Sequence, residues 1–121
     1  MSIFKDQEEF MIACGQGVDT YDQEQYNLYL NLIREEFNEL QVAIADNDRL
    51  EQLDALLDLI VVIVGAMHSA GFDGEGGWEE VIRSNMSKLD PVTNKVIKRE
   101  DGKVLKPETY SPPNLEPFLV K

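Results

Sequence analysis

Apolar residues recur at helical spacing along most of the chain. Between positions 26 and 44 they follow one another every three or four residues, which predicts an amphipathic helix with a coiled-coil-like seam: Tyr26, Leu30, Ile33, Phe37, Leu40 and Ile44. Residues 50–69 are apolar on almost every side, as is typical of a helix in the middle of a bundle. Two further helices are predicted over 3–13 and 78–89, with a flexible glycine-rich loop over 71–77.

The pattern changes after the fourth predicted helix. Residues 96–100 and 103–106 flank Asp101-Gly102, a dipeptide that strongly favours a β-hairpin, with Glu100 opposite Lys103. The proline-rich remainder is expected to be extended. We therefore predict a single all-α domain over residues 1–121, with a four-to-five-helix bundle over 1–91 and a hairpin and tail over 92–121. A lone hairpin is marginal in water, so we expect it to lean on the helices or on a second subunit.

The charge balance is strongly acidic. Eleven Lys and Arg face 23 Asp and Glu, which gives a net charge of −12. Such a surface repels phosphate backbones and anionic lipids, so we expect neither a nucleic-acid nor a membrane partner. Cys14 is the only cysteine, which excludes a disulfide framework or a CxxC zinc site and suits the reducing cytoplasm.

Some acidic residues interrupt apolar surface. They lie one turn apart in two groups, one on each of the two long predicted helices: Glu35, Glu36 and Glu39, then Glu51, Asp54 and Asp58. Together they would place four or five negative charges close to one another, which a cation would neutralise, and hard oxygen ligands suit Mg²⁺ or Mn²⁺. The alternative is that they are solvated helix charges, and spacing alone leaves the two interpretations about equally open. We expect His68 to be a core or interface histidine.

A basic counterpart follows the acidic helices. Asn85 and Lys88 share one face near the end of the fourth predicted helix, and further basic residues lie in the hairpin: Lys98, Arg99, Lys103 and Lys106. A metal site with a basic strip suits a polyphosphate substrate. The strip could equally serve only to offset the acidic residues of the protein.

Several motifs occur in the order found in a known superfamily. REEFNEL (34–40), DALLDLIVVIVGA (54–66) and SNMSKL (84–89) resemble the MazG-like all-α nucleoside triphosphate pyrophosphohydrolases, which include phosphoribosyl-ATP pyrophosphohydrolases and dimeric dUTPases. FMIACGQ (10–16) and residues 101–115 are similar to small bacterial and phage members, so the resemblance covers nearly the whole chain.

The resemblance implies hydrolysis of a (deoxy)nucleoside triphosphate between its α- and β-phosphates, which controls the nucleotide pool. It implies Mg²⁺, with Mn²⁺ as a substitute, held by Glu36, Glu39, Asp58 and Asp54, and Glu35 as the base. The family Glu falls on Ala55, so Asp54 or Glu51 takes its place. The implied substrate contacts are Asn85, Lys88, Lys103, Lys106 and Tyr110.

The resemblance also implies a homodimer or homotetramer in the cytoplasm, that of the host if the chain is phage-encoded. We expect the nucleotide base near Phe10, Met11 and Gln16. A different class of function stays open: an acidic helical interaction module, such as a DNA mimic, without catalysis.

Overall fold

The structure is a computed structural model that describes residues 2–121. Within this range the elements are α1 (Ile3–Ala13), α2 (Gln23–Ala45), α3 (Arg49–Ser69), α4 (Gly74–Met86), β1 (Ile97–Lys98), β2 (Val104–Leu105) and a 3₁₀ turn (Glu116–Phe118). The prediction of an all-α fold with a short C-terminal hairpin is confirmed. The chain forms two compact units, Met1–Gly74 with Leu119–Lys121, and Glu75–Phe118. That residues 1–121 act as one domain stays a prediction.

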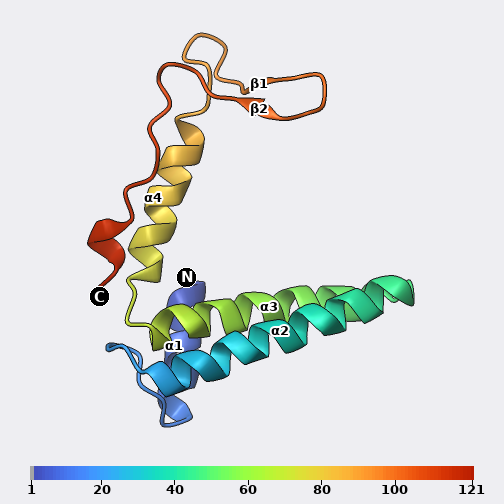
Figure 1. Cartoon of the computed structure of the whole chain (residues 1–121), viewed down its shortest axis with the longest axis vertical. Coiled ribbons are helices and arrows are strands. Elements are labelled where there is room, and N and C mark those ends of the chain that lie inside the picture. Colours follow the sequence, from blue (N-terminus) through green and yellow to red (C-terminus); the bar gives the residue numbers. More distant parts are fainter. Residues whose placement is uncertain (1) are drawn as a thin grey trace. The chain divides into compact units, whose positions relative to one another are not determined.

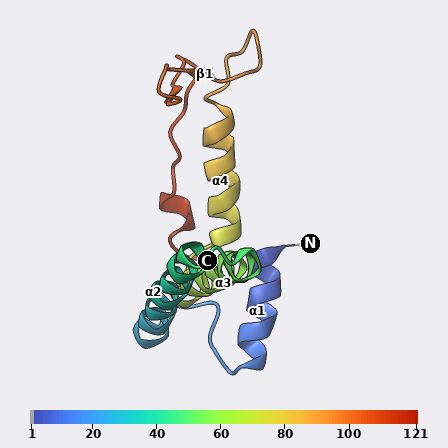
Figure 2. The ribbon, with the colours of Figure 1, turned by 90° about the vertical axis from the view of Figure 1, so that its right-hand side faces the viewer.

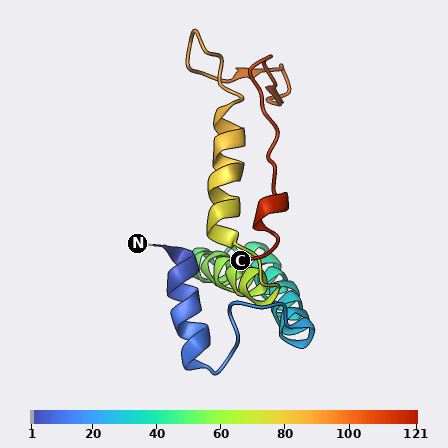
Figure 3. The same ribbon diagram turned by 90° about the vertical axis from the view of Figure 1, so that its left-hand side faces the viewer.

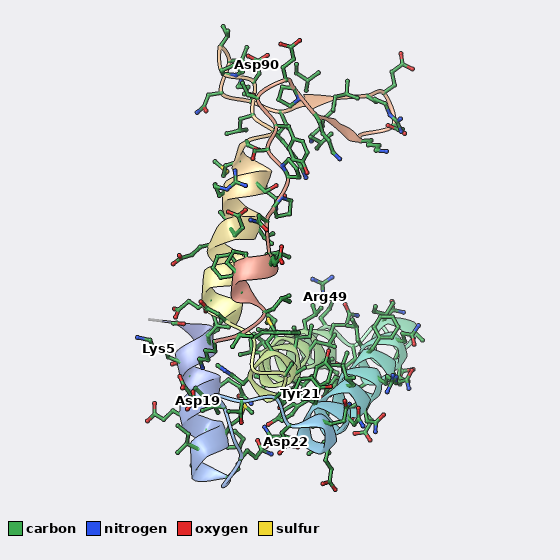
Figure 4. All side chains as sticks on the ribbon, turned by 60° about the vertical axis from the view of Figure 1, so that its left-hand side comes forward. Lys5, Asp19, Tyr21, Asp22, Arg49 and Asp90 are labelled. Carbon is green, nitrogen blue, oxygen red and sulfur yellow. The ribbon has the colours of Figure 1, made fainter. Side chains whose placement is uncertain are left out.

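In the first unit, α2 and α3 form an antiparallel helical hairpin (Figure 1). An aspartate caps the start of each helix: Asp22 accepts a hydrogen bond from the Gln25 N–H, and Asp48 accepts one from the Glu51 N–H, both at 3.1 Å. Figure 4 labels Asp22 at its position before α2. Each such cap stabilises a helix by about 1 kcal/mol. The two caps therefore fix where the long helices begin.

A small core forms where α3 packs against α2 and against α1 (Figure 2). Its buried members are Met11, Val18, Tyr29, Val62 and Ala66. The Tyr29 ring lies against Gly65, where any Cβ atom would overlap ring carbons. His68 is also buried, and its Nε2 lies 2.8 Å from the Phe4 carbonyl oxygen. The prediction of a satisfied core histidine is thus confirmed.

Within its own chain, α3 is covered along only part of its length. Buried residues gather in the C-terminal half, whereas large apolar side chains nearer its start are exposed, from 45% at Ile60 to 75% at Leu50. The central place of α3 in a bundle therefore stays a prediction for its N-terminal half. No single helix of the described chain is long and apolar enough to cross a membrane, although α3 and α4 pass the length and composition test as a pair.

The prediction of a loop over residues 71–77 was wrong, because α4 already begins at Gly74. Glycine has low helix propensity, but here packing outweighs that cost. A Cβ at Gly74 would come within 2.9 Å of Phe4 Cε1 and 3.1 Å of Met67 Sδ, so the site favours a residue without a side chain. The helix also ends earlier than predicted, at Met86.

In the second unit, the tail runs back along α4 (Figure 3). The Ser111 N–H donates to Ser87 Oγ at 2.9 Å, and the Asn114 N–H donates to Glu80 Oε2 at 2.7 Å. Arg83 reaches the Pro112 carbonyl oxygen at 3.2 Å. The contacts come from Glu80 and Arg83 on α4 and from Ser87 in the turn that follows it, at steps of three and four residues, so polar side chains along one face hold the tail.

The hairpin forms, but its predicted register was wrong. Ile97 pairs with Leu105 and Lys98 with Val104, so Arg99, not Glu100, lies opposite Lys103. The connection has three residues, with Gly102 at φ +88°, which is the geometry of a hairpin loop that ends in a left-handed residue. The Arg99 guanidinium instead pairs with Asp101 within the loop.

Candidate functional site

Four carboxylates of the first unit influence one another across the α2–α3 hairpin. We define the acidic cluster as Glu36 and Glu39 on α2 with Asp54 and Asp58 on α3. Burial is the main cause that raises the pKa of Glu36 to about 7; a hydrogen bond with Glu39 and the charges of Glu39, Asp58 and Asp54 add to it. The pKa of Asp58 is also raised, first by burial and then by Asp54 and Glu39. The two helices therefore do bring their one-turn acidic groups together.

No basic residue of the described chain neutralises this cluster. None of the four carboxylates forms a salt bridge with a Lys or Arg of residues 2–121. Glu36 Oε2 is buried and has no hydrogen-bond partner among these residues. A buried carboxylate oxygen without a partner is costly, so the protein gains free energy when a ligand or ion contacts it.

The donor set fits a hard divalent cation. All candidate ligands are carboxylate oxygens, and Mg²⁺ prefers oxygen ligands. As they lie, no group of three or more His, Cys, Asp or Glu side chains among residues 2–121 has a geometry that could hold a metal ion. Like charges repel, which disfavours rotamers that bring all four carboxylates together in the absence of a cation. The orphaned Glu36 oxygen and the crowded charges make these residues fit for an ion after side-chain rotation.

Ala55 occupies the position at which the resemblance would place a glutamate ligand. Ala55 is buried between α2 and α3, at 3% exposure, so this position faces the helix interface. Asp54, its neighbour, contributes charge to both Glu36 and Asp58, whereas Glu51 is not among the causes of either shift. Glu51 instead lines a shallow pocket of about 310 Å³ with Glu39 and the α2–α3 turn. These observations favour Asp54 as the fourth carboxylate.

Glu35 lies on α2 beside the cluster and is exposed. Its side chain is therefore open to solvent, unlike that of Glu36, which is half-buried. A residue that takes a proton from water needs access to water. The exposure of Glu35 is compatible with that role.

The predicted substrate contacts lie in the second unit. Lys88 Nζ donates to Asn85 Oδ1 at 3.2 Å, so this predicted pair is in contact. Lys106 and Lys88 both approach the Tyr110 ring, with Nζ to centroid distances of 4.9 and 5.9 Å. Lys103 directly follows the hairpin loop, and its N–H donates to Asp101 Oδ1. Lys88 and Lys106 therefore meet at the Tyr110 ring, and Asn85 contacts one of these two lysines.

The structure also shows a polar network that the sequence did not reveal. The Tyr29 hydroxyl donates to Gln16 Oε1 at 2.6 Å, and Gln25 holds the backbone of Gly17 with two hydrogen bonds of 3.1 and 2.7 Å. Gln16 and Gln25 line a pocket of about 540 Å³ at the start of α2. This pairing joins Gln25 on α2 to Gly17, eight positions earlier in the preceding loop, and no periodic pattern signals it.

Met11 is fully buried in the core, so the expectation that it contacts a nucleotide base was wrong. A side chain with no exposed surface packs against its neighbours and does not reach a ligand. Phe10, the adjacent residue, is 60% exposed. Gln16 lines the pocket at the start of α2.

Comparison with known proteins places the chain in the MazG-like all-α superfamily. Residues 8–85 match the family model described as phosphoribosyl-ATP pyrophosphohydrolase, so the chain belongs to that family. The membership supports nucleotide pyrophosphohydrolase activity in general, that is, hydrolysis of an acid anhydride. A search of curated proteins gives no match.

Proposed function

We propose that this protein hydrolyses a nucleoside triphosphate between the α- and β-phosphates, to give the monophosphate and pyrophosphate, with Mg²⁺ as its metal. The observation that carries the proposal is the buried, partnerless Glu36 oxygen within a cluster of carboxylates from two helices. Family membership supplies the general reaction. The substrate and the metal are our inference.

Glu36, Glu39, Asp54 and Asp58 would hold the ion, and Mn²⁺ could replace Mg²⁺. When bound, it would neutralise phosphate charge and polarise the bond to the leaving group. The protonation state of Glu36 would change on ion binding, because its raised pKa leaves much of this carboxyl protonated at neutral pH in the free protein. A cation favours the ionised carboxylate, so ion binding releases a proton there.

Glu35 would act as the general base and take a proton from the attacking water. It lies next to Glu36 in sequence but is exposed, so it can exchange that proton with solvent. Asn85, Lys88, Lys103, Lys106 and Tyr110 would bind the substrate through its phosphates or sugar. Their ammonium and amide groups are hydrogen-bond donors, which suits anionic oxygens.

The protein would act as a homodimer or homotetramer in the cytoplasm. The exposed apolar residues in the N-terminal half of α3 support this, because a monomer rarely leaves such a contiguous apolar surface in water. The surface includes Leu50, Leu53, Leu57 and Ile60. A second copy of α3 would cover it.

The test is a substrate panel with detection of released pyrophosphate. It includes the common ribo- and deoxynucleoside triphosphates, together with phosphoribosyl-ATP, the substrate in the name of the family. We expect pyrophosphate and the corresponding monophosphate in equal amounts with at least one nucleotide, and only with Mg²⁺ or Mn²⁺ present. Release of orthophosphate instead, or no product from any nucleotide, would contradict the proposal.

A further inference from the structure

Two ammonium groups of the second unit approach the Tyr110 ring. Lys106 Nζ is 4.9 Å and Lys88 Nζ is 5.9 Å from the ring centroid. Both distances fall within the range of cation–π attraction. Lys88 comes from the turn after α4 and Lys106 from the residue after β2, so the ring brings together two segments of the unit.

Neither ammonium group has an acidic partner. No carboxylate of the described residues forms a salt bridge with Lys88 or Lys106, although acidic residues outnumber basic ones 23 to 11. The arginines nearby differ, because Arg83 is paired with Glu80 at 2.7 Å and Arg99 with Asp101. Asn85 Oδ1 already accepts from Lys88, which leaves its amide N–H groups as donors. The two lysines and the Asn85 amide therefore offer positive charge and hydrogen-bond donors to an anionic ligand.

Tyr110 is held in place independently of the lysines. Its N–H donates to the Pro107 carbonyl oxygen at 3.0 Å, and the following residue, Ser111, donates to Ser87 Oγ at 2.9 Å. The tail is therefore attached to α4 next to the ring. A ring anchored by its backbone can position flexible lysine side chains, which otherwise lose rotamer freedom when they bind a ligand.

We propose that Tyr110 is a positioning residue that holds Lys88 and Lys106 as one binding site for two linked phosphoryl groups. The inference rests on the proposed function, because such a ligand is the polyphosphate of the substrate or the pyrophosphate product. Two ammonium groups that approach the same ring match two linked phosphoryl groups better than a single phosphate. The aromatic ring attracts the two ammonium groups but does not neutralise them, as a carboxylate would, so their positive charge stays available to a ligand.

The test measures binding of inorganic pyrophosphate to the full chain by calorimetry, in EDTA at low ionic strength. EDTA removes the contribution of metal ions, so the measurement reports the lysine pair. We expect Lys88→Met and Lys106→Met each to weaken binding by about tenfold, since each removes a charge-assisted contact. Lys95→Met makes the same charge change without contact to Tyr110, and we expect it to weaken binding less than twofold. Orthophosphate should bind the wild type at least about tenfold more weakly than pyrophosphate.

Two substitutions of Tyr110 separate positioning from direct contact. Tyr110→Phe keeps the aromatic face and should bind pyrophosphate within about twofold of the wild type, whereas Tyr110→Leu should bind it about three- to tenfold more weakly. In the Lys88→Met/Lys106→Met background, Tyr110→Leu should have no further effect, because the ring acts through the lysines. With an active nucleotide substrate, Tyr110→Leu should raise KM and leave kcat near that of the wild type. Binding of a nucleoside triphosphate with a non-hydrolysable α,β bridge is measured in the same variants. A loss of its affinity would show that the lysines bind the substrate polyphosphate, and an unchanged affinity would show that they bind only the free product.

Several results would overturn the inference. One is equal loss of affinity in Tyr110→Phe and Tyr110→Leu, which would assign the role to the hydroxyl group. Another is unchanged pyrophosphate affinity in the lysine variants. If the same variants also have a lower particle mass than the wild type in light scattering, the lysines bind carboxylates of a second copy. If pyrophosphate binding responds as expected but no nucleotide in the panel is hydrolysed, the binding site stands and the proposed function fails.

Discussion

The contact between Tyr29 and Gly65 sets the register of the α2–α3 hairpin. The ring lies where a Cβ of residue 65 would be, so the two helices approach closely at this point. Seven residues further along α2 is Glu36, and seven residues earlier on α3 is Asp58. Seven residues are about two helical turns, so in an antiparallel pair this contact places Glu36 opposite Asp58. The apolar core and the acidic cluster are thus parts of one helix pairing.

Gly65→Ala should therefore destabilise the protein and disturb the cluster. The added methyl group overlaps the Tyr29 ring, and overpacking of this kind costs about 1–3 kcal/mol. Thermal unfolding followed by circular dichroism measures the loss as a lower Tm. Gly17→Ala is the matched control, since its Cβ would meet no atom within 4 Å. Equal Tm values for the two variants would mean that the close approach at Gly65 is not needed.

The raised pKa of Glu36 predicts how the stability of the metal-free protein depends on pH. The folded state binds the proton more tightly than the unfolded state, so this group favours folding at low pH, and its contribution is lost as pH rises from about 4.5 to about 7. Because the side chain is only half-buried, we expect a loss of about 1 kcal/mol.

Chemical denaturation in EDTA at pH 5 and pH 8 measures this difference. Glu36→Gln should remove most of it, because glutamine does not titrate, while the raised pKa of Asp58 acts in the same direction and accounts for the rest. The lowered pKa of Glu80, about 2, acts in the opposite direction but only below pH 4.5, outside this window. An unchanged difference between pH 5 and pH 8 in Glu36→Gln would assign the effect to other groups.

Glu35→Gln should separate the base from the metal ligands. We expect kcat to fall by roughly 10²- to 10⁴-fold, the usual contribution of a general base, with Mg²⁺ affinity close to that of the wild type. Steady-state kinetics and metal titration measure the two properties. Loss of Mg²⁺ affinity in this variant would make Glu35 a ligand, and the base would be another residue.

The apolar surface at the start of α3 predicts self-association. Light scattering at micromolar concentration should give two or four times the chain mass of 13.8 kDa. Leu57→Glu should lower that mass, because Leu57 is 53% exposed in the single chain and a buried charge is costly. Val92→Glu is the control, at 91% exposure in a turn. A wild-type mass near 13.8 kDa with full activity would show that each site is built within one chain.

The sequence predicted the helices well, because their signals are local. Helical spacing of apolar residues predicted α2 and α3 to within a few residues of their observed bounds. The sequence-based prediction failed where long-range packing determines the start of a helix. Glycine usually indicates a loop, but α4 begins at Gly74, which packs against Phe4 and Met67. The hairpin register was wrong because Asp101-Gly102 suits both two- and three-residue loops.

The candidate site was predicted from spacing and resemblance, and its internal arrangement was not. The sequence favoured Asp54 as the fourth ligand but left Glu51 open, because both satisfy one-turn spacing with a neighbouring acid. Only the paired helices show that Asp54 adds its charge to Glu36 and Asp58. The meeting of Lys88, Lys106 and Tyr110 depends on the path of the tail along α4, which no local pattern encodes.

Asp58→Asn tests the central claim most directly. The measurement is pyrophosphate release from the best nucleotide of the panel, with and without Mg²⁺, in Asp58→Asn and in the control Glu9→Gln, an exposed acid on α1. We predict no Mg²⁺-dependent release from Asp58→Asn, wild-type release from the control, and a metal-free Tm of Asp58→Asn equal to or above that of the wild type, because the substitution removes a charge from a repelling cluster. Release at the wild-type rate from folded Asp58→Asn would contradict the account.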